Sequence, residues 1–449
     1  MTPPSKDARI LIVGAGEFGL STAYFLLATG YSSVTILDRT TPPVPDGSSV
    51  DISRIVRADY DDIVYTNMVV EALELWKTEY KEFYYPCGLL SMTPRDNPKY
   101  LADALANVSE MGLPITQFNS GQDAAQYLKL AHDKPLDGLA GYLSHDAGWA
   151  YASKAIEHLF RKCMELGAIF IKSRVDEILY SADHSTVTGV KLDSNNVFIC
   201  DFAVIAAGAW TDTLVPSESR MLATGQPVAF IQLTEEEYSK YKHLPIYINF
   251  VSGFYVFPPH PESHVVKAAR HSYGYTNYQT VNKSSSSRES SQPPEVAYSQ
   301  GETPPQRTTL PQDAEDCLRH GLAEYFGRDI AKRDFVKTRI CWYNDTPAKD
   351  FLFDYLPGVD NLFIATGGSG HGFKFLPVIG KYSVGSIERT LPAKLLDKFK
   401  WGSDIQRKED LSRGGTPLMT LQDAEAGVYP VYPVTDAESR QESPNRYTN

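Results

Sequence analysis

Arg9-Ile-Leu-Ile-Val-Gly14-Ala-Gly16-Glu-Phe-Gly19 is the stretch that decides the fold of this 449-residue chain. Its apolar residues 9–13 predict a buried strand, and the glycines that follow predict a tight turn into a helix over 20–29. Residues 34–37 predict a second strand, which ends at Asp38. In this order, strand, glycine turn, helix, strand and acid predict a βαβ unit that binds a dinucleotide.

The glycines and the acid have distinct expected roles. Gly14 permits the tight turn, Gly16 lets the backbone approach a pyrophosphate, and Gly19 lets the helix pack closely on the strand. The helix N-terminus supplies N–H groups and the positive end of its dipole to the phosphates. Asp38 lies where an acid would bind ribose hydroxyls, which disfavours NADP. FAD and NAD both remain open on these residues alone.

Later segments predict returns of the chain to the same sheet. They are residues 168–172, 202–206 and 362–365, the first of them after a helix over 152–166. Because these strands are far apart in sequence, the insertions between them are expected to form another domain. Those insertions are aromatic and strand-like, and they predict a mostly antiparallel second layer: 86–92, 225–233, 246–258 and 265–270.

Composition argues against several classes of protein. The formal net charge is -12 and no dense Lys/Arg run occurs, which argues against nucleic-acid binding. Five scattered cysteines without a CxxC pair argue against a disulfide framework and favour a reducing compartment. No signal peptide precedes the first strand, and no apolar run reaches membrane-spanning length. We therefore expect a soluble, intracellular and cytoplasmic protein, since the terminal Tyr-Thr-Asn lacks a Ser-Lys-Leu type of peroxisomal address.

Two segments in the last third of the chain carry a resemblance to a known family. Residues 339–347 read Arg-Ile-Cys-Trp-Tyr-Asn-Asp-Thr-Pro, and residues 365–374 read Ala-Thr-Gly-Gly-Ser-Gly-His-Gly-Phe-Lys. They resemble the monomeric sarcosine oxidase family, which includes pipecolate and saccharopine oxidases and the fructosyl-amino-acid oxidases (amadoriases). The resemblance implies an α/β fold of the glutathione-reductase and p-hydroxybenzoate-hydroxylase kind. A discontinuous, Rossmann-like FAD domain would be joined to a mostly antiparallel substrate domain.

The expected domain boundaries follow from this resemblance and from composition. We expect the FAD domain to comprise residues 1–85, 145–215 and 330–415, and the substrate domain to comprise residues 86–144 and 216–329. Residues 281–311 are rich in Ser, Pro, Gln and Glu and predict a mobile surface loop, while 419–449 predict a polar tail. The family leans towards monomers, and we expect one here.

The resemblance also assigns residues to the cofactor. In the family a cysteine at the place of Cys341 forms a thioether to the flavin ring, although an ordinary buried thiol is the alternative. Gly368, Gly370 and Gly372 follow an apolar strand, and a loop without side chains can press against the flavin. Ser53 and Arg54 are implied on the flavin side of the pocket. The backbone of Val175 could bond the adenine.

The substrate carboxylate is assigned to Arg57 and Lys374 by the same resemblance. Arg offers a planar fork to a carboxylate, and a charge-assisted hydrogen bond contributes roughly 1.5–3 kcal/mol. The alternative is that Arg54 and Arg57 only neutralise nearby acids, namely Asp51, Asp59, Asp61 and Asp62.

Lys267 is the candidate for the oxygen-consuming step. Strand alternation predicts that Lys267, Ala269 and His271 share one face. As O2 takes its first electron, superoxide charge develops beside the flavin and a cation stabilises it. At about 5 Å and an effective dielectric near 20, this attraction is roughly 3 kcal/mol, on the order of a hundredfold in rate. In the family the matching lysine acts through water near flavin N5.

His271 and Tyr255 bear on the choice of substrate. Fructosyl-amino-acid oxidases usually carry Glu at the place of His271, whereas sarcosine oxidases carry His, so a sugar-bearing substrate is disfavoured. Tyr255 also matches the small-amine group, and core packing is the alternative for both side chains. The segment Ser412-Arg413-Gly-Gly resembles one with an arginine that amadoriases use, which keeps that activity open.

Together these residues predict an FAD-dependent oxidase of a secondary amino acid, either N-alkylated or cyclic. The enzyme would transfer a hydride from the C–N carbon to flavin, give an imine, and reduce O2 to hydrogen peroxide. The alternatives are an amadoriase, a natural-product tailoring amine oxidase or a non-catalytic flavin-binding protein. An NAD-dependent dehydrogenase would explain the first 38 residues but not Cys341 and the glycine loop.

Overall fold

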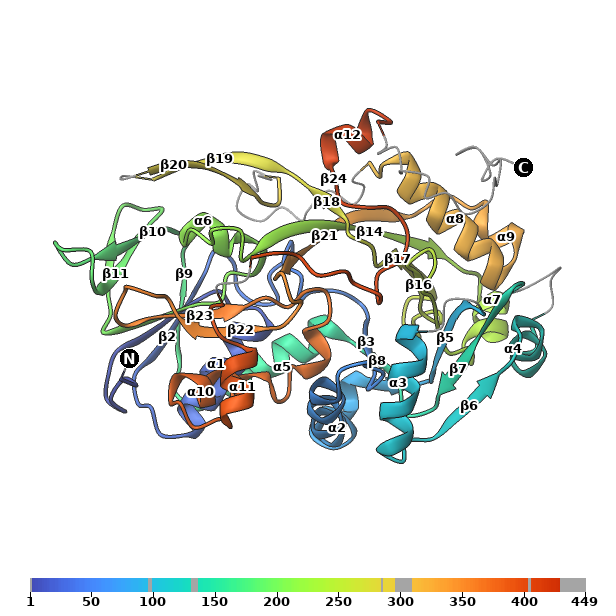
Figure 1. The fold of residues 1–449 in the computed structure, drawn as a ribbon, viewed down its shortest axis with the longest axis horizontal. Coiled ribbons are helices and arrows are strands. Elements are labelled where there is room, and N and C mark those ends of the chain that lie inside the picture. Colours follow the sequence, from blue (N-terminus) through green and yellow to red (C-terminus); the bar gives the residue numbers. More distant parts are fainter. Residues whose placement is uncertain are drawn as a thin grey trace.

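The computed structural model describes residues 2–95, 99–130, 136–283, 286–294, 309–402 and 405–428. Two large sheets dominate this part of the chain, one mostly parallel and one mostly antiparallel. Figure 1 shows the first on the left and the second extending across the top and right. The predicted α/β class, with a Rossmann-like sheet and an antiparallel layer, is confirmed.

The six-stranded sheet has the strand order β22-β23-β13-β1-β2-β9. Its strands are β1 (Ile10–Val13), β2 (Val34–Asp38), β9 (Ile169–Lys172), β13 (Phe202–Ile205), β22 (Leu352–Tyr355) and β23 (Leu362–Thr366). Only β22 is antiparallel to its neighbour. A parallel sheet is covered on both faces, so its strands are continuous apolar runs, and all five sequence-predicted strands belong to it.

The two faces of this sheet pack against different layers. Ile10 and Ile12 of β1 belong to a core shared with α1 (Glu17–Ala28) and α5 (Ala152–Glu165). Leu11 and Val13 belong to a second core beneath a three-stranded sheet. That small sheet comprises β10 (Val175–Tyr180), β11 (Val187–Leu192) and β12 (Val197–Ile199). In Figure 1 the helices lie below the strands, together with α10 (Ile379–Ile387) and α11 (Ala393–Lys398).

The ten-stranded sheet is the predicted antiparallel layer. Its path is β24-β18-β14-β17-β16-β15-β5-β7-β6, with β21 paired to β14. The strands are β5 (Leu89–Pro94), β6 (Ile115–Phe118), β7 (Leu139–Ser144), β14 (Leu222–Gln232), β15 (Ile246–Asn249), β16 (Phe254–Val256), β17 (Val265–Arg270), β18 (Tyr275–Thr276), β21 (Lys337–Asp345) and β24 (Met419–Thr420). Only the β15–β5 and β18–β24 pairs are parallel.

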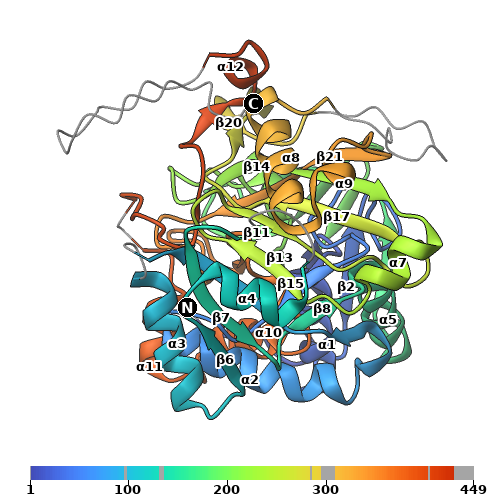
Figure 2. The same cartoon turned by 90° about the vertical axis from the view of Figure 1, so that its right-hand side faces the viewer.

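Helices cover this larger sheet. Figure 2 shows α8 (Gln312–Phe326) and α9 (Arg328–Ala331) near β17, with α3 (Lys99–Glu110) and α4 (Gly121–Leu128) lower down. The remaining helical elements are α2 (Ile63–Lys77), η1 (Lys81–Phe83), η2 (Gly208–Trp210), α6 (Thr211–Leu214), α7 (Glu235–Tyr241), η3 (Phe373–Phe375) and α12 (Leu421–Glu425). A three-stranded sheet contains β3 (Arg54–Val56), β4 (Tyr84–Pro86) and β8 (Gly148–Ala150).

Three segments differ from the sequence-based expectation. Most of residues 281–291, expected in a mobile loop, form an antiparallel hairpin of β19 (Tyr278–Lys283) and β20 (Ser286–Ser291), while residues 295–308 lie outside the described residues. The expected tail begins with β24 and α12, and residues 429–449 again lie outside. Residues 330–415, assigned to one domain, contribute strands to both large sheets. In the described part of the chain, no helix is long and apolar enough to cross a membrane.

Candidate active site

A cavity of about 1530 Å³ extends from the carboxyl ends of β1 and β2 to β21 and the loop after β23. Sites for drug-sized ligands occupy about 300–1,000 Å³, so this cavity suits a larger ligand. Its lining includes nine residues predicted to bind the cofactor: Gly14, Gly16, Asp38, Arg54, Val175, Cys341, Gly368, Gly370 and Gly372. The other three, Gly19, Ser53 and Lys374, lie behind the lining.

The glycine turn has the geometry expected for phosphate binding. Gly14 has φ +110°, and a Cβ atom there would lie less than 3.0 Å from the carbonyl oxygen of Ala206. A Cβ atom on Gly19 would collide in the same way with the Gly14 carbonyl. Gly16 is the N-cap of α1 and supplies no side-chain cap, so backbone N–H groups at the helix start can bind an anion.

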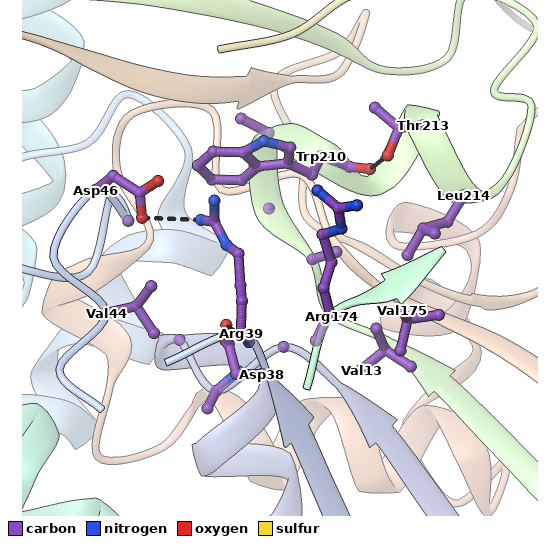
Figure 3. Close-up of a pocket in the computed structure, with 18 of the residues that line it drawn as sticks. Val13, Asp38, Arg39, Val44, Asp46, Arg174, Val175, Trp210, Thr213 and Leu214 are labelled. Atoms are coloured by element: carbon purple, nitrogen blue, oxygen red, sulfur yellow. Dashed lines mark hydrogen bonds and ion pairs between the residues drawn. The ribbon is translucent and has the colours of Figure 1, made fainter. Parts of the chain in front are cut away.

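Figure 3 shows the end of the cavity beside β2. Asp38 accepts hydrogen bonds of 2.7 Å from the backbone N–H groups of Ala15 and Arg39, and burial raises its pKa. The guanidinium of Arg39 lies 4.1 Å from the ring centroid of Trp210 and forms a 2.8 Å ion pair with Asp46. Sequence reasoning missed Arg39. The signal available was that Arg39 directly follows the acid.

The β19–β20 hairpin forms another wall at this end. Thr280, Val281, Asn282 and Lys283 line the cavity. Arg288 donates to the carbonyl of Asp212 in α6, and Lys283 donates to that of Asp176 in β10. Figure 1 shows the hairpin above α6 and β10. A segment with no apolar pattern is thus held against the cavity by polar contacts.

Cys341 lies at the opposite end of the cavity with two guanidinium groups at its sulfur. Arg339 and Arg54 donate to Sγ at 3.3 and 3.5 Å. Burial opposes ionisation, but Arg339 and Arg54 together lower the pKa of the Cys341 thiol. Burial raises the pKa of the other four cysteines, Cys87, Cys163, Cys200 and Cys317. Arg339 was missed, although strand alternation places it on the same face as Cys341.

Lys267 is 1% exposed and lies behind the cavity lining. Its Nζ is 2.7 Å from Asp51 Oδ2 and donates to the Ser53 carbonyl at 2.7 Å. Arg54 pairs with the same carboxylate oxygen. Arg54 therefore neutralises Asp51, as expected if the arginines served only to balance nearby acids, but it also contacts Cys341. Burial and Arg54 lower the pKa of Lys267 to about 7, and Asp51 opposes that shift.

Arg57 and Lys374 meet at the ring of Tyr60. Their charged groups lie 5.1 and 5.2 Å from its centroid, and Lys374 donates to Tyr60 Oη at 2.9 Å. They are 8% and 5% exposed. Among the described residues neither forms an ion pair, and Nη1 of Arg57 has no hydrogen-bond partner. Asp59 lies near both groups and Glu17 lies near Lys374, and each raises the pKa of its basic neighbour without forming an ion pair with it in the described residues. Two buried basic groups that lack an ion-pair partner form a place for an anion, because an unpaired buried charge is costly.

His271 and Tyr255 lie near Tyr343, which is two residues after Cys341 on β21. Nδ1 of His271 is 3.3 Å from Tyr343 Oη, and burial together with Arg413 lowers the pKa of His271 to about 3. Burial raises the pKa of Tyr255 to about 12. His271 is therefore neutral at ordinary pH. The structure brings these side chains to the Cys341 end of the site, outside the cavity lining.

Arg413 is fully engaged with acids. It donates to both oxygens of Asp345 at 2.9 and 2.6 Å, and its Nε lies 3.0 Å from Asp410 Oδ2. It also donates to the carbonyl of Ser369 in the glycine loop at 3.2 Å. Unlike Arg57, Arg413 has no unused charge to offer a ligand.

The two ends of the cavity fit FAD. One end has an acid for a dinucleotide and a helix N-terminus whose N-cap is a glycine, where the Glu17 N–H donates to Ser49 Oγ at 2.9 Å and the other N–H groups can serve an anion. At the other end a cysteine and a loop of glycines line the same space, where a Cβ atom on Gly370 would lie less than 3.0 Å from the Tyr343 ring. The residues present thus suit a nucleotide at one end and a flat ring at the other.

Comparisons with known proteins agree with this geometry. A family profile described as FAD dependent oxidoreductase matches residues 9–384. L-Saccharopine oxidase of Schizosaccharomyces pombe is 32% identical over 435 residues, covering 93% of this chain and 98% of the relative. Monomeric sarcosine oxidase of a Bacillus species is 25% identical, with 84% and 92% covered. The solved structure of fructosamine oxidase (amadoriase II) from Aspergillus fumigatus has a TM-score of 0.80 at 27% identity, with 94% and 97% covered.

Proposed function

We propose a substrate class from the following premise: this chain belongs to the FAD-dependent oxidoreductase family and is an FAD-dependent amine or amino-acid oxidase acting on CH–NH groups. The proposed substrate is a secondary amino acid, N-alkylated or cyclic. This premise leaves the NAD-dependent alternative without support. The observation that carries the proposal is the pair of buried basic side chains, Arg57 and Lys374, which form no ion pair among the described residues, with Nη1 of Arg57 left without a hydrogen-bond partner.

Arg57 and Lys374 would bind the substrate carboxylate. The free Nη1 of Arg57 can donate to one carboxylate oxygen, and the Lys374 ammonium can donate to the other. Tyr60 lies between the two cations and fixes their separation. A bound carboxylate would also restore the charge of Lys374, whose pKa burial and Arg57 lower.

The substrate amine must be neutral, because its lone pair supports departure of the hydride. Two cations beside the amine lower its pKa, so no carboxylate base is required. His271 is held neutral and can accept a hydrogen bond from the amine. When bound, FAD would take up the hydride and pass both electrons to O2, so that an imine and hydrogen peroxide leave the site. Lys267 would supply the positive charge near the reacting end.

Cys341 would hold the cofactor through a thioether. The sulfur lines the cavity, and the two guanidinium groups beside it favour the thiolate, which is the nucleophilic form of cysteine. At the other end Gly16, the start of α1 and Asp38 would hold the dinucleotide.

Two residues disfavour a fructosyl amino acid as substrate. His271 stands where amadoriases usually carry an acid, and Arg413 is already bonded to Asp345 and Asp410. The relatives named as oxidases of L-saccharopine, sarcosine and N-methyl-L-tryptophan act, by those names, on secondary amino acids. The fructosamine oxidases share the fold and remain the second candidate.

A peroxide assay with matched substrates tests the proposal. The panel pairs each secondary amino acid with its primary analogue, with its methyl ester and with a fructosyl amino acid. We expect peroxide from the secondary amino acid and little from its ester, which lacks the carboxylate. An ester oxidised as fast as the acid would refute the role of Arg57 and Lys374. A fructosyl amino acid is also N-alkylated, so its faster turnover would show that the preferred substrate bears a sugar and would make the enzyme an amadoriase.

A further inference from the structure

Asp51 connects the two cationic residues that approach the flavin end of the site. It lies just before β3, and its side chain is 2% exposed. One carboxylate oxygen accepts from the Ile52 N–H at 2.8 Å, while the other receives both Lys267 and Arg54. Its carbonyl accepts from the N–H and hydroxyl of Ser153 in the first turn of α5, at 3.0 and 2.9 Å. Hydrogen bonds therefore hold both the carboxylate and the backbone carbonyl of Asp51 in place.

Of the three basic groups near Asp51, Lys267 is the one that loses its proton most easily. Arg54 and Arg339 lie on either side of Cys341, and an arginine does not lose its proton in a protein. A buried ammonium beside two such cations is disfavoured by burial and by repulsion. Asp51 is the acid that opposes both effects, and it stabilises the positive charge of Arg54 and Arg339 as well.

We propose that Asp51 is a positioning residue, which holds the Lys267 side chain beside the flavin end of the site and favours its protonated form. The benefit for the O2-consuming step rests on the function proposed above for Lys267. The charge of Lys267 can be measured independently of that function.

The titratable and charged groups around Lys267 and its partner Asp51 come from several elements. They are Asp51 and Arg54 around β3, Tyr255 on β16, His260 in the following loop, and Lys337, Arg339 and Cys341 on β21. Within this group only Asp51 carries a fixed negative charge at neutral pH, because burial raises the pKa of Tyr255 and lowers that of His260. The thiol of Cys341 would lose its charge on forming a thioether.

The test compares holoenzyme of the wild type and Asp51→Asn. NMR of labelled lysine side chains gives the pKa of Lys267, with its signal assigned from Lys267→Met. Stopped-flow kinetics give the reoxidation rate of reduced enzyme by O2 against pH, and the anaerobic reduction rate separately. We expect the Lys267 pKa to fall by about one unit or more, so that reoxidation slows about tenfold above pH 7 and recovers at lower pH. Reduction by substrate should change much less.

Asp313→Asn is the matched control. Asp313 pairs with buried Arg270 at 2.8 Å in the same sheet region but does not contact Lys267. We expect this variant to lose thermal stability while the Lys267 pKa and the reoxidation profile stay at wild-type values. Should Asp51→Asn fail to fold, Asp51→Glu retains the negative charge and should leave the titration of Lys267 close to that of the wild type.

Three outcomes separate this inference from the proposed function. A Lys267 pKa that is unchanged in Asp51→Asn, or one that falls in Asp51→Glu although the negative charge is retained, would overturn the inference. A lowered pKa with slow reoxidation in both Asp51→Asn and Lys267→Met supports both proposals. If the Lys267 pKa falls in Asp51→Asn but both Asp51→Asn and Lys267→Met are reoxidised at the normal rate, the effect of Asp51 on Lys267 is supported. Only the role of Lys267 in the reaction with O2 is then contradicted.

Discussion

Arg54 and Arg57 lie three residues apart at β3 and have opposite surroundings. Arg54 is paired with Asp51 and touches the Cys341 sulfur, whereas Arg57 packs on the rings of Tyr60 and Tyr100 and keeps one nitrogen without a hydrogen-bond partner. At the scale of single residues, an ion pair marks the cofactor end, and a basic group without an ion pair marks the carboxylate position. Within the described residues the same distinction separates Arg413, which forms ion pairs, from Lys374, for which none is found.

Arg57→Met tests the carboxylate position. Loss of one charge-assisted hydrogen bond of roughly 1.5–3 kcal/mol should lower kcat/KM for the amino acid about 10- to 100-fold. Activity towards the methyl ester, already low, should change little. The control Arg319→Met removes an arginine of α8 that pairs with Glu315, and kcat/KM should be unaffected. An equal loss for acid and ester would contradict the assignment.

Cys341→Ala tests the covalent attachment. After acid precipitation the yellow colour should stay with wild-type protein and pass into the supernatant of the variant, since only the thioether survives unfolding. Cys317→Ala, at a thiol whose pKa burial raises, should behave like wild type. If the wild-type protein also released its colour, Cys341 would be an ordinary buried thiol without a covalent bond to the flavin.

The residues that sequence reasoning found and missed differ in one physical respect. Cys341, Lys374 and the glycines belong to short motifs, so their neighbours in sequence are also their neighbours in the site. Asp51 was considered only as a nearby acid for Arg54, because its contact with Lys267 depends on how β3 meets β17. Arg339 was passed over because its role depends on Arg54, which is distant in the sequence.

At the scale of elements, the loop after β23 shows why glycine is required at particular positions. Gly370 has φ +77° and lines the cavity, and a Cβ atom there would meet the ring of Tyr343 on β21. Gly358 has the same φ of +77°, but a Cβ atom there would meet no neighbouring side chain or backbone within 4 Å. The two glycines share the backbone strain and differ only in their neighbours.

Gly370→Ala and Gly358→Ala therefore form a matched pair. Each should lose roughly 1–2 kcal/mol of unfolding free energy from the left-handed conformation. Gly370→Ala should in addition displace Tyr343 and weaken flavin binding, seen as a lower flavin-to-protein ratio in the purified enzyme. Equal flavin content in both variants would show that the loop does not press on the flavin.

Strand prediction succeeded where burial is regular. β1, β13 and β23 are buried on both faces, so their apolar runs are plain in the sequence. β19 has a single buried residue, Val281, and its hairpin is held by polar contacts from Arg288 and Lys283 to other segments. Such an element leaves no hydrophobic period to detect.

At the scale of the whole molecule, the C-terminal segment closes onto the site. Asp410 pairs with Arg413 and with Lys349, and Arg413 continues to Asp345 on β21. Residues near position 410 are thereby linked to the larger sheet and to the glycine loop. The expected domains were ranges of the sequence, each with its own sheet. The site combines residues from both large sheets with residues from this C-terminal segment.

Acid should release this linkage. Burial opposes the shift, but Arg413 and Lys349 lower the pKa of Asp410 to about 2, below its ordinary value of about 3.9. Its stabilisation is complete above about pH 5 and is lost as the pH falls through about 2, a change of roughly 2 kcal/mol. Thermal unfolding of Asp410→Asn should thus match wild type near pH 2 and fall below it at pH 7. Asp397→Asn, at an exposed pair with Lys400, should match wild type throughout.

Anaerobic titration of the holoenzyme tests the central claim most directly, that this oxidase takes a secondary amino acid. The visible flavin absorbance is followed as substrate is added without O2. We predict that a secondary amino acid bleaches it fully, that the primary analogue and the methyl ester leave it nearly unchanged, and that air restores the colour with release of one peroxide per flavin. The account would be contradicted if no sugar-free secondary amino acid reduced the flavin, while a primary amine or a fructosyl amino acid did.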